Sequence, residues 1–141
     1  MKMAICMSIS SAFALVAHGA DMNASCPAAL TGDDVTVRAP LGWKGSAQPV
    51  IRLVAAGMMA GPPESHADLV PYKQRRLKNG AETTWVFDGG EKWYVCTYGS
   101  YAIQLARRLD DSATQCTVRH TSAGLPAVTS AAVECTTKKW Q

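Results

Sequence analysis

Residues that could carry out acid–base or nucleophilic chemistry are few in this 141-residue chain. Beyond the N-terminal segment, His66 follows a proline-rich turn and His120 ends a β-like run. Neither has a nucleophile and an orienting acid near it in sequence, which are the partners that a catalytic triad needs. Five acids could supply the carboxylate pair of a glycosidase, although most occupy turn-like stretches: Glu64, Asp68, Glu82, Asp88 and Glu91. We therefore predict that the protein is not an enzyme and uses no cofactor.

Cysteine is the residue type with the most informative pattern. Cys26, Cys96, Cys116 and Cys135 all follow an apolar N-terminal stretch of the kind that directs export. An even number of cysteines in an exported domain is typical of disulfides. Their wide spacing contains no Cys-x-x-Cys pair of the kind that binds zinc. The sequence predicts two disulfides and no metal site.

Sequence alone does not decide which cysteines pair, because four cysteines allow three connectivities. We favour Cys96–Cys116, which closes a short loop, together with Cys26–Cys135, which closes a long one. In a flat meander, however, Cys96 and Cys116 would lie two strands apart, about 9–10 Å. A disulfide needs Cα atoms within about 7 Å. The favoured pairing therefore requires the last run to cross to another sheet or the sheet to fold over, and otherwise Cys26 pairs with one of the two.

A second group of residues could bind a protein partner. Trp85, Trp93 and Tyr101 lie close together in the sequence, and Arg75 and Arg76 precede them. Because Trp, Tyr and Arg dominate the energetics of protein interfaces, we take these five as candidate partner-binding residues. The alternative is that most of the aromatic residues form the core, and that the basic run around the two arginines is a solvated loop or edge.

Residues 1–20 are predicted to be a signal peptide and residues 21–141 a single domain. Lys2 precedes an apolar stretch that is too short to be a good membrane span, and small residues follow it. The whole chain has a net charge of +3, and Lys2 belongs to the predicted signal, so the exported part carries +2. Such a small excess argues against nucleic acid as a partner. No lipid-anchor motif precedes Cys26, and we expect a periplasmic protein without a membrane anchor.

The stretch from 82 to 120 is predicted to be an antiparallel meander. Four runs rich in aromatic and β-branched residues occupy 83–87, 92–98, 101–109 and 116–120. Turn residues separate these runs, and Asp88-Gly89-Gly90-Glu91 is the clearest hairpin signal. Further strands are predicted at 35–39, 49–56 and 128–136. About seven short strands, with at most one short helix, predict a mainly β protein: an antiparallel β-sandwich or a half-closed barrel.

The run from 92 to 98 is expected to lie at the centre of a sheet. Side chains alternate along a strand, so Tyr94, Cys96 and Tyr98 share one face. The opposite face carries Trp93, Val95 and Thr97. Because both faces carry apolar bulk, we expect this strand to be covered on both sides.

A series of short motifs runs along the exported chain. They are Cys26-Pro27, Gly42-Trp43, Gly61-Pro62-Pro63-Glu64, Leu69-Val70-Pro71, Trp85, Trp93-x-x-Cys96-x-Tyr98, Leu105 with Arg107-x-Leu109, and Cys116-x-Val118. In these the chain resembles a family of small exported proteins of Gram-negative bacteria with no assigned activity, some of them encoded near type VI secretion genes. It departs from the family at Ala60, where an acidic residue usually precedes Gly-Pro-Pro. The resemblance implies a periplasmic location and an immunity role.

Three functional hypotheses follow. The first is a periplasmic immunity protein or inhibitor that blocks a cell-wall-targeting type VI secretion effector. The second is an inhibitor of host lysozyme, although a positive net charge argues against an inhibitor of that basic enzyme. The third is a carbohydrate- or peptidoglycan-binding module, which would stack sugars on exposed Trp85 or Trp93.

Overall fold

The computed structural model describes residues 22–123 and 128–138, so the predicted signal peptide lies outside the described residues. Nine strands lie within them, together with two single turns of 3-10 helix, η1 (Gly32–Asp34) and η2 (Pro63–Ser65). The strands are β1 (Asn23–Ser25), β2 (Ala29–Thr31), β3 (Val50–Met59), β4 (Lys73–Leu77), β5 (Gly80–Val86), β6 (Trp93–Tyr98), β7 (Ile103–Arg108), β8 (Gln115–Ala123) and β9 (Val128–Thr136).

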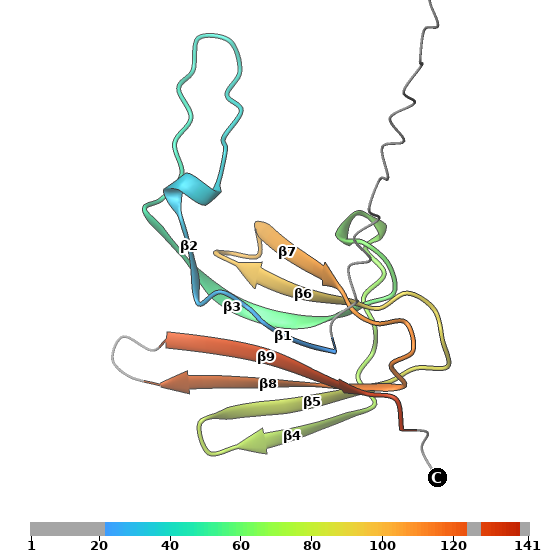
Figure 1. Cartoon of the computed structure of the whole chain (residues 1–141). Helices are drawn as coiled ribbons and strands as arrows, with labels where there is room; N and C mark the ends of the chain where they lie inside the picture. Colours follow the sequence, from blue (N-terminus) through green and yellow to red (C-terminus); the bar gives the residue numbers. More distant parts are fainter. Residues whose placement is uncertain (1–21, 124–127, 139–141) are drawn as a thin grey trace, which may run out of the picture.

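The strands form two antiparallel sheets that pack face to face (Figure 1). One sheet has five strands in the order β1-β9-β8-β5-β4, and the other has four in the order β2-β3-β6-β7. The predicted antiparallel sandwich is therefore confirmed. The sequence-based count of about seven strands was low, because β1, β2 and β4 are too short or too polar to give a clear alternating pattern.

The core lies between the two sheets and follows the alternation of side chains along each strand. Trp85 of β5 lies opposite Cys116 of β8, and Val118 of β8 lies opposite Val133 of β9. The four-stranded sheet contributes Leu53, Met58, Tyr94, Cys96 and Tyr98 to the same cluster. The predicted inner face of the 92–98 run is thus confirmed. Burial of each large apolar side chain contributes about 1.5–3 kcal/mol.

The N-terminal segment closes one side of the sandwich by passing from one sheet to the other. β1 pairs with β9 in the five-stranded sheet, and β2 pairs with β3 in the four-stranded sheet. Between them, the Cys26 amide donates to the Ala131 carbonyl at 2.9 Å. The Tyr98 hydroxyl donates to the Pro27 carbonyl at 2.9 Å, and the Tyr94 hydroxyl lies 3.1 Å from Cys26 Sγ. Two buried tyrosines therefore hold the crossing against the core.

The predicted disulfide pairing was wrong, whereas the prediction of two disulfides is confirmed. The bonds are Cys26–Cys96 and Cys116–Cys135, with Cα–Cα distances of 5.7 and 4.1 Å. Cys116 and Cys135 lie directly opposite each other on neighbouring strands β8 and β9. Cys96 lies on β6 in the other sheet, where the N-terminal crossing brings Cys26 to it. Cys96 and Cys116 therefore lie in different sheets of the sandwich and not two strands apart in one sheet.

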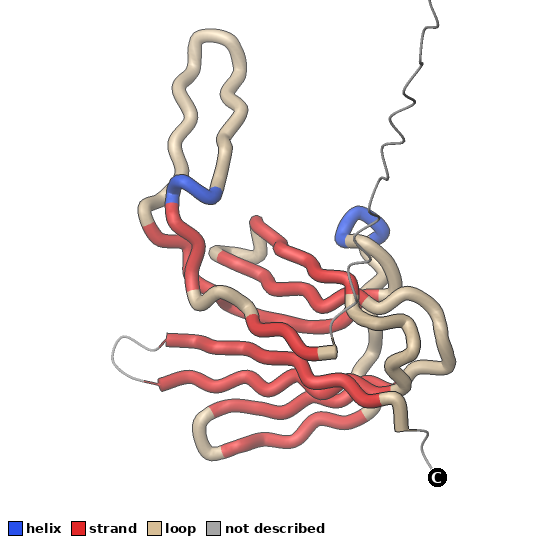
Figure 2. The backbone as a smooth tube through the Cα atoms, in the orientation of Figure 1, coloured by secondary structure: helices blue, strands red, loops and turns tan. Residues whose placement is uncertain are grey.

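The predicted meander was also wrong. β6 and β7 form a hairpin, but β5 pairs with β4 and β8, and β6 pairs with β3 and β7. The Asp88–Glu91 turn therefore connects the two sheets and does not close a hairpin. The segment 35–39, predicted as a strand, has no strand structure and forms one side of a long protruding loop (Figure 2).

Candidate partner-binding surface

The outward face of the four-stranded sheet is shallowly hollowed. Val95 and Thr97 of β6 point away from the core and are nevertheless buried. Their neighbours across β3 are small, since Gly57 lies opposite Val95 and Ala55 opposite Thr97. A Cβ placed at Gly57 would meet nothing within 4 Å, so the small residue leaves open space. Val95 and Thr97 are thus buried as expected from the sequence, but the groove leaves part of this face open, so the predicted coverage of β6 on both sides is only partial.

A groove of about 280 Å³ lies over these residues. One wall is the segment 67–71, which runs along the free edge of β3. The Leu69 amide donates to the Met58 carbonyl at 3.0 Å, and the Ala60 amide to the Ala67 carbonyl at 2.9 Å. Trp85 Nε1 donates to the Leu69 carbonyl at 2.9 Å, which joins this wall to the core. The groove is therefore built on fixed backbone.

Tyr101 stands at the rim of this groove, and its side chain is 73% exposed. It lies in the β6–β7 turn with φ +64°, two residues after Gly99 with φ +63°. A left-handed conformation at a residue other than glycine costs roughly 1–2 kcal/mol. The turn thus holds a large aromatic ring in solvent in a backbone conformation that a glycine would adopt more easily.

Trp93 lies on the same face of β6 as Val95 and Thr97 and is half-buried. Its Nε1 donates to Glu91 Oε2 at 3.1 Å, and Glu91 Oε1 accepts from Arg108 Nη1 at 3.2 Å. Arg108 lies opposite Trp93 on β7 and also binds Asp111 Oδ2 at 2.7 Å. The structure therefore places Trp93 and Tyr101 on one sheet, beside and at the rim of the groove.

Arg75 and Arg76 lie on the other sheet, on the edge strand β4. Arg75 and Arg119 both bind Glu82, at 3.0 and 2.9 Å. The hydrogen bond from Arg119, followed by that from Arg75, lowers the pKa of Glu82 below its ordinary value. Charged residues on an edge strand discourage pairing with another chain. This placement agrees with the expected solvated edge, and the two arginines do not join Trp93 and Tyr101 on one surface.

Trp85 is buried, with 5% of its surface exposed, and contributes only a small part of the groove lining. Sequence reasoning also missed Lys92, which is fully buried. Its Nζ donates to the carbonyls of Gly90 and Asp111 at 2.8 and 2.7 Å and lies 5.3 Å from the centre of the Phe87 ring. A lysine that opens a strand usually lies at the surface, so no local signal identifies this one as the residue that joins two loops.

Within residues 22–123 and 128–138, no cluster of three or more His, Cys, Asp or Glu side chains is arranged to hold a metal ion. No helix in this part of the chain is long and apolar enough to cross a membrane.

Comparison with known protein families shows the family to which this chain belongs. The model of the type VI secretion system Tli immunity proteins matches residues 47–136, which is more than half of the chain. The chain belongs to this immunity-protein family. It is therefore an immunity protein against a type VI secretion effector, and the immunity role predicted from the sequence is confirmed. No curated protein and no solved structure gives a significant match. The match contains β3 to β9, and so it includes the groove, Trp93 and Tyr101.

Proposed function

We propose that this immunity protein acts in the periplasm, where it neutralises its effector by direct binding and catalyses no reaction. Family membership supports a protein partner. The two disulfides support export, since such bonds persist in oxidising compartments. Residues 1–20 would then be the signal peptide and residues 21–141 the exported domain. Tight inhibition by a small, rigid domain is favourable because little conformational entropy is lost on docking.

The exposure and backbone conformation of Tyr101 are the main support for the contact surface that we propose. An exposed ring held in a costly backbone conformation is typical of a functional site. A tyrosine at the rim of a groove and a tryptophan beside it resemble the anchors that dominate protein interfaces. We propose that Tyr101 and Trp93 contact the effector over the groove of the four-stranded sheet. Trp85 is left out because it is buried.

Arg75 and Arg76 lie on the edge strand β4 of the other sheet, so contact of either with the effector would be separate from the groove. Both are exposed, and they lie on opposite faces of β4 because side chains alternate along a strand. Exposed charges in a complex mainly affect the association rate and its salt dependence. If the effector reaches β4, substitution of these arginines would slow binding and change its salt dependence more than it accelerates dissociation.

The cell wall as the effector's target remains a prediction from the sequence. The carbohydrate alternative rested on Trp85 and Trp93, of which Trp85 is buried and Trp93 half-buried. An assay of the purified effector on peptidoglycan would test this prediction, and inhibition of that activity by this protein would be measured in the same assay.

Replacing Tyr101 by Asn tests the contact surface. Asn adopts the left-handed conformation more easily than Tyr, so the melting temperature should stay the same or rise. Loss of the ring should weaken binding to the effector by roughly tenfold or more, as expected for a hot-spot residue. The matched control is Val86→Asn, an exposed position on the five-stranded sheet. An unchanged Kd for Tyr101→Asn, in a protein that still protects cells, would remove the groove from the interface.

A further inference from the structure

The loop between η1 and β3 forms a protruding arm, residues 35–49, that stands clear of both sheets (Figures 1 and 2). Its tip is a tight turn in which the Trp43 amide donates to the Pro40 carbonyl at 3.0 Å. Gly42 occupies the third position of this turn with φ +85°, the conformation that a type II turn requires there. Leu41 is fully exposed and Trp43 is 76% exposed at this tip.

The arm has a defined shape rather than the freedom of an open loop. Its two sides touch at Gly45, where a Cβ would lie 2.6 Å from Val37 Cγ1, so a larger residue would force the sides apart. At its base, the Thr31 amide and hydroxyl donate to Asp34 Oδ2 at 2.7 and 2.8 Å. The backbone hydrogen bond from Thr31 lowers the pKa of Asp34. The apolar tip is therefore presented at the end of a narrow projection whose two sides meet at Gly45 and Val37.

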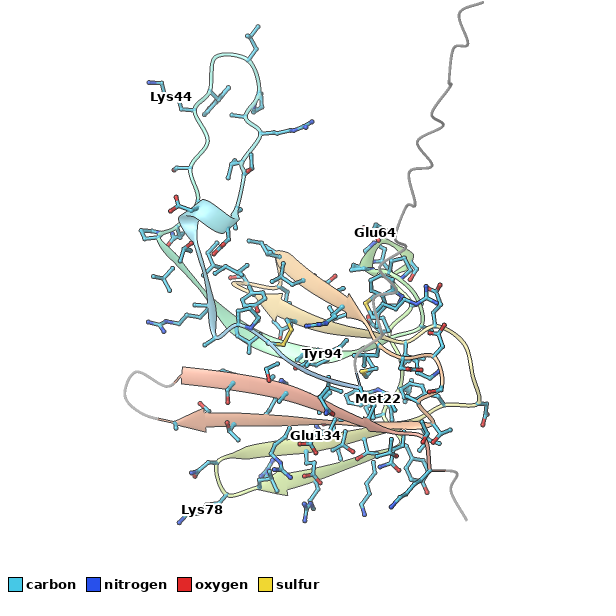
Figure 3. The ribbon with its side chains drawn as sticks, in the orientation of Figure 1. Met22, Lys44, Glu64, Lys78, Tyr94 and Glu134 are labelled. Atoms are coloured by element: carbon cyan, nitrogen blue, oxygen red, sulfur yellow. A yellow bond between two sulfur atoms is a disulfide. The ribbon has the colours of Figure 1, made fainter. Side chains whose placement is uncertain are left out.

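The charge on the arm has one sign. Arg38 and Lys44 are exposed, and no acidic residue occurs from 35 to 49. The side chain of Lys44 points into solvent from the side of the arm (Figure 3). A narrow apolar tip flanked by cations is complementary to an apolar recess with carboxylates at its mouth.

We propose that the arm inserts Leu41 and Trp43 into an apolar, acid-rimmed recess on the type VI effector. This inference rests on the proposed function, because it names a second contact of the same complex. A protein partner is favoured over a membrane because the family is defined by protection against an effector, and two cations are fewer than the cluster of four to eight that anionic lipids usually require. All but the last three residues of the arm precede the region that matches the family model, 47–136. Most of the arm thus lies outside the region that the family model describes.

The test uses the purified protein and its purified type VI effector. Leu41→Ala with Trp43→Ala should weaken the complex by roughly thirtyfold or more, the effect of losing a hot-spot anchor. Lys44→Glu should also weaken binding to the effector, and this loss of affinity should be larger at low salt than at high salt. Matched controls are Val86→Ala for the apolar change and Lys138→Glu for the charge change. All variants should keep the wild-type melting temperature, because these side chains lie outside the core.

The possible outcomes separate this inference from the proposed function. If the arm variants bind the effector as tightly as wild type does, the inference is overturned and the proposed function stands. If wild type itself neither binds the effector nor protects against it, the proposed function fails as well. Binding of wild type, but not of the arm variant, to phosphatidylethanolamine–phosphatidylglycerol vesicles without effector would assign the arm to the membrane and overturn the proposal. A dimer in sedimentation that the arm variant loses would assign it to self-association and also overturn it.

Discussion

Tyr101 combines an exposed aromatic ring with a backbone conformation that disfavours its side chain. The exposed ring lowers solubility, and the left-handed backbone conformation lowers stability. A glycine or asparagine would close the same turn at lower cost. The structure gives the ring no contribution to the core, since Tyr101 is outside the buried cluster. We propose that binding to the effector is the role that accounts for both features.

His120 is half-buried, and its Nε2 atom is buried without a hydrogen-bond partner in the described part of the chain. It lies on β8 between Ala81 of β5 and Ala131 of β9. Burial lowers the pKa of His120 below its ordinary value of 6.5. The imidazole is therefore neutral in the folded protein at a pH where the unfolded chain already binds a proton.

The lowered pKa of His120 predicts that the free energy of unfolding decreases as the pH falls. The stability due to neutral His120 is present above about pH 6.5 and is lost as the pH falls below that value towards the lower folded pKa. The slope from one proton is at most about 1.4 kcal/mol per pH unit. Replacing His120 by Gln should flatten the free energy of unfolding between roughly pH 6.5 and 5, measured by urea denaturation. The exposed His66→Gln variant is the control. Identical pH profiles for His120→Gln and wild type would contradict this account.

Residue types alone predicted the chemistry of the candidate residues but not their exposure. Trp85 and Trp93 read alike in sequence, as aromatic residues in neighbouring runs. Trp85 faces Cys116 in the core, whereas Trp93 faces outward beside Glu91 and Arg108. Which face is buried depends on the packing of the two sheets, and that packing is set by contacts between residues far apart in the chain.

At the scale of elements, local patterns predicted strands well and strand partners poorly. The Asp88–Glu91 turn has the residues of a hairpin, but its flanking strands β5 and β6 lie in different sheets. The alternation at 35–39 is that of a strand, yet no neighbouring strand pairs with this segment in the described structure. Strand identity depends on local sequence, whereas pairing depends on distant segments, and a single sequence reports only the first.

The two disulfides also depend on which distant segments pack together. Cys116–Cys135 joins two neighbouring strands, and Cys26–Cys96 joins the N-terminal crossing to the other sheet. The sequence separations are 19 and 70 residues. Each bond therefore stabilises a different part of the sandwich, and neither links the two halves of the predicted meander.

Removing each disulfide in turn should have unequal effects. In the loop-entropy model, loss of the longer loop closed by Cys26–Cys96 costs about 4 kcal/mol, and loss of Cys116–Cys135 about 3 kcal/mol. The two double alanine variants, compared by urea denaturation, should rank in that order. Thiol titration of the denatured, unreduced wild-type protein should find no free thiol among the four cysteines. Two or more free thiols, or the reverse ranking, would contradict the pairing described here.

At the scale of the whole molecule, the sandwich presents two features on which a partner could dock. The groove of the four-stranded sheet lies within the region shared with the family, whereas most of the arm lies before it. Fold class and two disulfides could be predicted from composition, turn residues and cysteine count, because these properties are local or additive. The groove could not, since it arises where β3, the segment 67–71 and the β6–β7 hairpin come together. The immunity role was foreseen through family resemblance and not through any catalytic or binding motif.

We propose that this chain neutralises a type VI effector by binding it in the periplasm. The most direct test is the survival of cells that carry this effector directed to the periplasm. Cells would express either the full chain or a version that lacks residues 1–20. We predict survival only with the full chain, and recovery of a stable complex of the two proteins from the periplasm. Death in both cases, or equal protection by the version without residues 1–20, would contradict the account.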